Sequence, residues 1–132
     1  MTYSARAVNA KANAIADLLD GGVLELCGGN QPTSADTVVT DYAPLARLTF
    51  GVPAFHHAVD GVLDAYPLEP EAMAGAAGTA RWFRCCTADG YPVLDGTVGT
   101  HDADCTLSNT TILVGSRVTI DGFRLTEPRE DT

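Results

Sequence analysis

The chain has 132 residues, of which 45% are hydrophobic and 19% are charged, a size and composition typical of one globular domain. Eight Lys and Arg residues against seventeen Asp and Glu give a formal net charge of −9, so the surface repels the phosphates of nucleic acids and anionic lipids. The sequence contains no apolar run long enough to span a bilayer, and residues 1–6 lack the basic start and apolar stretch of a secretory signal. We therefore expect a single domain over residues 1–132, assembled in a cytoplasm, without nucleic-acid or membrane partners.

A helix or arm is expected at residues 4–20, because apolar residues recur there at helical spacing. Ser4 has the side chain of an N-cap, and Gly21-Gly22 ends the helix. The helix either seals the end of the chain's own β-fold or docks on a neighbouring chain. We favour its own body, since two glycines permit a tight reversal into the next element. The apolar face consists of Val8, Ala12, Ile15 and Leu19, and the opposite, polar face consists of Arg6, Asn9, Asn13, Asp17 and Asp20.

After residue 22 the apolar residues alternate with polar ones, as they do in strands that are buried on one face. Asp89-Gly90 predicts a hairpin turn between two strands, and Gly122 interrupts the alternation of the last strand, which predicts a bulge. The core side of that strand consists of Val118, Ile120, Phe123 and Leu125. Strands are expected at residues 23–27, 45–50, 58–65, 79–87, 92–98, 104–108 and 117–126, with long connections at 28–44 and 67–78.

Seven or so short strands separated by turn residues indicate a mainly β fold, an antiparallel β-sandwich or jelly-roll-like domain with one N-terminal helix. The β-sandwich is expected to occupy residues 23–126. The charged residues 127–132 are expected to form a loose tail.

The four cysteines do not have the CxxC spacing of a zinc or redox site. Buried thiols are therefore expected for Cys27, Cys85, Cys86 and Cys105, and a disulfide formed after release from the cell is the alternative. Cys85 and Cys86 are adjacent, so a strand points their side chains to opposite faces.

The best metal-ligand candidates are residues 101–105, His101-Asp102-Ala103-Asp104-Cys105, with Asp95 upstream. On a strand, however, Asp102 and Asp104 share one face and His101 lies on the other, and the spacing is not that of an EF-hand or a zinc motif. A solvated acidic turn is therefore expected. The pair His56-His57 is likewise expected to be a surface feature. For the sequence as a whole we predict no metal, no cofactor and no catalytic residues.

Trp82, Phe83 and Tyr91 are candidates for a sugar-binding aromatic platform. Adjacent strand residues face opposite ways, so Trp82 and Phe83 do not share a flat surface. We expect core packing for one and partial burial for the other. The stems of Arg81 and Arg84 are expected to cover these rings while their charges stay in water.

Six segments occur together in a recognisable order: Leu18 to Gly22, Gly29 to Pro32, Ala35 to Thr37, Leu48 to Gly51, Gly78 to Arg84 and Asp95 to Thr100. Together they resemble a family of small virion structural proteins of tailed phages and prophages. The resemblance covers nearly the whole chain, and its most specific part is the Gly-Thr-Ala-x-Trp-Phe-Arg segment. It implies a non-enzymatic role in a virus particle and brings no catalytic residues. The cysteines and His56-His57 depart from the family pattern.

The resemblance gives only a virion structural protein. Within that class, an acidic β-rich domain with an N-terminal arm suits a capsid decoration (cement) protein that bridges major capsid subunits and forms a homo-oligomer. The acidic surface favours the exterior of the virion, because the packaged DNA would repel it. The alternatives are a neck, connector or tail component of the same particle, and a host-surface or carbohydrate-binding β-sandwich. The last would need an exposed aromatic patch. An enzyme would need a clustered acid–base pair, and the sequence contains no recognisable one.

Overall fold

The computed structural model describes residues 1–37, 44–71 and 73–127. The fold is mainly β, with one N-terminal helix, as the sequence predicts. The elements in chain order are α1 (Ala5–Leu19), β1 (Val23–Cys27), β2 (Ala46–Thr49), β3 (Val62–Asp64), β4 (Gly78–Thr79), β5 (Trp82–Cys86), β6 (Pro92–Gly99), β7 (Cys105–Thr106), β8 (Thr111–Ile112) and β9 (Gly122–Thr126).

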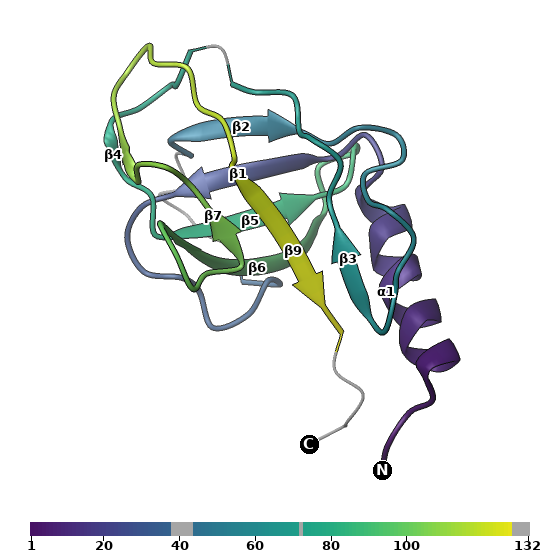
Figure 1. Cartoon of the computed structure of the whole chain (residues 1–132). Coiled ribbons are helices and arrows are strands. Elements are labelled where there is room, and N and C mark those ends of the chain that lie inside the picture. The colour runs from purple at the N-terminus through teal and green to yellow at the C-terminus, as the bar shows by residue number, and fades with distance from the viewer. Residues whose placement is uncertain (38–43, 72, 128–132) are drawn as a thin grey trace.

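Seven strands form one curled sheet in the order β2-β1-β5-β6-β7-β9-β3, and β4 pairs with β8 in a small second sheet. The paired strands are antiparallel except β6 and β7. β9 crosses in front of β1 and β5 (Figure 1). There the Phe123 ring meets the Phe83 ring of β5 edge-on, with 5.1 Å between centroids. The sheet therefore folds over on itself and encloses the core between its two halves.

β5 lies in the middle of the packing, and all five of its residues are buried. Phe83 points into the core and is fully buried. Its ring needs a glycine opposite, because a Cβ placed at Gly96 would lie 2.4 Å from the Phe83 ring. A second glycine, Gly90, has a φ of +90° in the β5–β6 hairpin, a conformation that glycine adopts without strain. The hairpin predicted at Asp89-Gly90 is confirmed.

Both edges of the large sheet are covered by the chain's own loops. At β2, Thr49 and Glu69 exchange backbone hydrogen bonds of 3.2 and 2.8 Å. At β3, the backbone N–H of His56 donates to the carbonyl oxygen of Asp64 at 2.8 Å. An open edge is a template for pairing with another chain. At these positions the chain's own loops, rather than another chain, pair with the edges of the large sheet.

Helix α1 lies against the folded sheet, beside β3 (Figure 1). Ser4 caps it, since its Oγ accepts a hydrogen bond from Ala7 N at 3.1 Å. At the other end Gly21 has a φ of +67° and its N–H donates to Gly51 at 3.1 Å. Both predicted boundaries are thus confirmed within one residue. The buried helix residues are Val8, Ala12, Ala16 and Leu19, whereas Ile15 is only half-buried.

The polar face predicted for the helix also contacts the chain's own body. Asn9 accepts a hydrogen bond from Gly61 N at 2.7 Å, and Asn13 accepts one from Ala58 N at 3.0 Å. Asp20 likewise accepts one from the loop before β3, at Ala54 N and 2.8 Å. Side chains of α1 and of its C-cap Asp20 therefore satisfy three backbone donors of the segment 54–61. The helix contacts the chain's own body through its apolar face and through the polar face beside it.

Replacing Asn13 by alanine is expected to destabilise the domain by about 1–3 kcal/mol, because the N–H of Ala58 loses its acceptor in a partly buried position. Asp17→Ala is the matched control, since Asp17 lies on the same helix but is exposed. Both changes raise helix propensity by a similar amount. Urea unfolding of both variants measures the difference, and equal stabilities would contradict the role given to Asn13.

Three strand boundaries differ from the sequence prediction. The strand expected at 58–65 is shortened to β3, because Asp60 and Gly61 have φ values of +50° and +78° and form a two-residue turn between Val59 and Val62. The strand expected at 79–87 is divided. Its start, β4, pairs with β8, while β5 pairs with β1 and β6. The strand expected at 117–126 begins only at Gly122, as β9. Val118 lies outside it and makes an isolated β-bridge to Glu71.

Smaller corrections concern the C-terminal third. The bulge expected at Gly122 is absent there, because Gly122 begins β9, and the register shift described by the structure lies between Cys85 and Cys86. The strand expected at 104–108 is reduced to β7, and β8 was not predicted. Glu127 is not part of a loose tail, since its N–H donates to Gly61 at 2.8 Å. The rest of the expected tail, 128–132, and part of the connection 28–44 lie outside the described residues.

Candidate functional site

A row of alternating charges crosses the outer face of the sheet. Arg47 of β2, Glu25 of β1, Arg84 of β5 and Asp95 of β6 lie opposite one another in register. Arg84 and Asp95 form a two-pronged ion pair, with nitrogen–oxygen distances of 2.7 and 3.0 Å. Arg47 approaches Glu25 at 2.9 Å. The prediction that the charge of Arg84 stays in water is wrong, because its side chain is only 7% exposed.

The segment 28–37, which follows β1, contacts the sheet at this row. Arg84 donates to the carbonyl oxygen of Thr37 at 3.2 Å, and the indole N–H of Trp82 donates to that of Gly28 at 2.9 Å. The Arg84 guanidinium also lies 5.5 Å from the centre of the Trp82 ring. A buried charge is tolerated only when it is paired and hydrogen-bonded. The row therefore anchors the loop to the sheet, and its arrangement is that of a structural network.

The four cysteines are buried, and no disulfide joins them. Burial, with a smaller contribution from neighbouring Glu25, raises the pKa of the Cys86 thiol to about 11. Burial and the carboxylates of Asp104 and Asp121 raise the pKa of Cys105 to about 12. The reactive form of cysteine is the thiolate. At neutral pH these two groups are thiols, and neither is placed as a nucleophile.

The acidic segment 101–105 does not gather into a metal site. Asp104 accepts hydrogen bonds from the N–H and the hydroxyl of Thr97, at 3.1 and 3.3 Å. Asp95 is paired with Arg84. Among the described residues there is no group of three His, Cys, Asp or Glu side chains placed to hold a metal ion.

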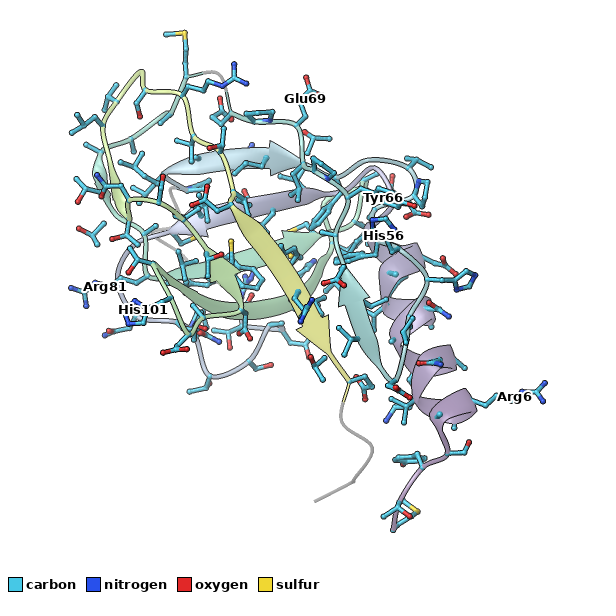
Figure 2. The ribbon with its side chains drawn as sticks, viewed as in Figure 1. Arg6, His56, Tyr66, Glu69, Arg81 and His101 are labelled. Carbon is cyan, nitrogen blue, oxygen red and sulfur yellow. The ribbon has the colours of Figure 1, made fainter. Side chains whose placement is uncertain are left out.

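The remaining histidines lie apart from that segment. His56 stacks on Tyr66, with 3.8 Å between ring centroids. Figure 2 shows this pair near α1, while His101 points outward on the opposite side of the molecule. There His101 Nδ1 lies 3.1 Å from the hydroxyl of Thr100. His56, His57 and His101 are all exposed, and the histidines are not brought together in one site.

The aromatic residues do not form a platform. Trp82 and Phe83 point to opposite faces of β5, as predicted, but both are buried, at 3% and 0% exposure. The expectation of partial burial for one of them is wrong, because the loop after β1 covers the outer face. Tyr91 is exposed in the β5–β6 hairpin. A flat sugar-binding surface of these three residues is therefore excluded.

An exposed apolar tip, which we define as Met73, Leu113 and Val114, lies on two adjacent loops. These side chains are 64–68% exposed. Backbone hydrogen bonds join the loops, among them those from Ala74 N to Ser116 O at 2.8 Å and from Gly115 N to Ala74 O at 2.9 Å. The β8–β9 loop that carries Leu113 and Val114 lies at the end of the molecule away from both termini (Figure 1). The backbone contacts therefore hold the two loops that carry these exposed apolar side chains next to each other.

No family model, curated protein or solved structure matches this chain. Within the described part of the chain, no helix is long and apolar enough to cross a membrane.

Sequence reasoning missed the apolar tip, although a signal was present. Leu113 and Val114 stand directly before Gly115-Ser116, a pair typical of turns. Two large apolar residues at the start of a turn have no strand partner to cover them, and that pattern predicts exposure. Met73 carried no such signal, because its loop comes next to the 113–116 turn only through backbone contacts between segments far apart in the chain.

Proposed function

We propose that this chain is a non-enzymatic structural protein of a tailed-phage virion, and more specifically a capsid decoration protein that bridges major capsid subunits. The sequence resemblance to small phage and prophage virion proteins supports the proposal that the chain is part of a virus particle. The apolar tip is the structural observation that carries the role. Exposed apolar side chains support binding to another protein through side-chain contacts. The edges of the large sheet pair with the chain's own loops instead.

The apolar tip has the properties of a docking surface. Burying one Leu, Val or Met side chain contributes about 1.5–3 kcal/mol relative to leaving it in water. Two loops joined through Ala74 hold the tip in place, so little conformational entropy is lost on binding. Three such side chains give weak binding for one copy. Many copies on a repetitive lattice, linked to one another as a homo-oligomer, add their contacts and bind strongly.

The charge of the chain supports a position on the outside of the particle. With a net charge of −9, the protein is repelled by packaged nucleic acid. An outer position also leaves the exposed acidic residues in water, where they favour solubility. The alternative place in the same particle is the neck, connector or tail. A carbohydrate-binding role loses its support, because Trp82 and Phe83 are buried.

Replacing the tip by serines, as Met73→Ser with Leu113→Ser and Val114→Ser, is expected to weaken binding to particles made without this protein by at least about tenfold, a loss of roughly 1.4 kcal/mol. Co-sedimentation of the purified variant with such particles measures the change. The stability should stay near that of the wild type, because all three side chains are exposed.

The matched control replaces three other exposed apolar side chains by serine, at Leu18, Val52 and Val59, which are 54–77% exposed. They lie on α1 and on the loops near β3, away from the tip. This control should bind as the wild type does. If the control loses binding and the tip variant keeps it, the apolar tip is not the docking surface.

A further inference from the structure

A cavity opens at the end of the curled sheet beside α1, with a volume of about 300 Å³. This volume is at the lower end of the range for ligand pockets in proteins. Ile15 of α1, Leu94 of β6 and Leu125 of β9 contribute to its walls, and Phe83 of β5 also lines it. The cavity lies where the two halves of the folded sheet approach the helix, and we call it the sheet mouth.

The walls of the sheet mouth are apolar but incompletely covered. Ile15, Leu94 and Leu125 are each half-buried, although Leu94 and Leu125 pack against the core. Ile15 belongs to the apolar stripe of α1, whose other predicted members are buried. Water in contact with such walls is released when an apolar group enters. The mouth therefore favours a ligand that carries a large apolar side chain.

The rim of the sheet mouth carries three carboxylates, which differ in their ion pairs. Glu127 pairs with Lys11 at 2.8 Å, and Asp95 pairs with Arg84. Asp104 also lines the mouth, is exposed, and accepts hydrogen bonds from Thr97. Among the residues that the structure describes, Asp104 forms no ion pair. A positive charge beside the apolar group of a ligand would pair with it.

We infer that the sheet mouth binds a segment of another protein chain in which a large apolar side chain stands next to a lysine or arginine. The apolar side chain enters between Ile15, Leu94 and Leu125, and the cation pairs with Asp104. This surface is distinct from the apolar tip. The inference does not rest on the proposed function, because a free peptide can test it without any particle.

The probe is the peptide Ac-Gly-Phe-Lys-Gly-NH2, titrated into the full chain labelled with ¹³C at its Ile and Leu methyl groups. The methyl signals of Ile15, Leu94 and Leu125 are expected to shift, with a dissociation constant on the order of 1 mM for one inserted side chain. The methyl signals of Leu113 at the apolar tip serve as an internal reference and should not move. The same peptide with glutamine in place of lysine should bind about two- to fivefold more weakly, because an exposed ion pair contributes little.

The variant Asp104→Asn should bind both peptides equally, since the amide oxygen keeps the contact with Thr97 but carries no charge. Asp89→Asn is the matched control. It removes the same charge from the exposed β5–β6 turn, where Asn-Gly is as favourable as Asp-Gly, and it should keep the preference for lysine. Absence of methyl shifts at Ile15, Leu94 and Leu125 overturns the inference. If the wild type binds the two peptides equally, the inference is wrong that the partner carries a lysine or arginine that pairs with Asp104.

Discussion

A chain that lacks residues 1–20 is expected to be unfolded at 25 °C. The helix buries Val8 and Leu19 completely, and burial of side chains of this size contributes about 1.5–3 kcal/mol each. Its removal also exposes the core surface beneath it and takes the acceptors from three backbone N–H groups of the segment 54–61. A domain of this size has a free energy of unfolding of only about 5–15 kcal/mol. Circular dichroism and size-exclusion chromatography of the truncated chain measure the result.

Two neighbouring leucines provide the graded control for the truncation. Leu19 is fully buried, whereas Leu18 is 54% exposed. Leu19→Ala should cost about 2–5 kcal/mol, and Leu18→Ala should stay within about 0.5 kcal/mol of the wild type. A truncated chain that is folded and monomeric would show that the helix is an arm for a neighbouring chain, contrary to the packing described above.

Trp82→Ala is expected to lower the free energy of unfolding by about 3–5 kcal/mol, the usual cost of removing a buried aromatic side chain. The indole is 3% exposed and donates to the carbonyl oxygen of Gly28. Its loss also removes a contact of the Arg84 guanidinium, which lies over the ring. For a domain of this length the melting temperature should fall by about 10–20 °C.

Tyr91→Ala is the matched control for Trp82, because Tyr91 is an aromatic residue that is 71% exposed in the next turn. Its melting temperature should stay close to that of the wild type. Scanning calorimetry of both variants compares them under one condition. An unchanged melting temperature for Trp82→Ala would mean that Trp82 contacts a partner in place of its own chain.

Local signals in the sequence predicted the helix, β1 and the β5–β6 hairpin well. Ser4 and Gly21 define the two ends of α1, and Asp89-Gly90 defines a turn in which Gly90 has a positive φ. These features depend on residues that are close in sequence. The Asp60-Gly61 turn carried the same signal as Asp89-Gly90, and giving it the same weight would have divided the strand expected at 58–65 correctly.

Features that depend on distant segments were not predictable in the same way. The burial of Arg84 requires Asp95 on the neighbouring strand and the backbone of Thr37, which follows β1 in the chain. β8 has two residues and exists because β4 lies beside it. The apolar tip and the sheet mouth are each assembled from loops and strands far apart in the chain. The sequence therefore indicated the class of fold, while the surfaces available to partners required the structure.

The most direct test of the proposed function is the copy number of this protein in purified virus particles. Quantitative mass spectrometry of gradient-purified particles compares its abundance with that of the major capsid protein. A decoration protein should be present in numbers comparable with the capsid subunits, because it repeats with the lattice. The copy number of a single ring would place the protein at the neck or tail, and its absence from purified particles would contradict the proposed virion role altogether.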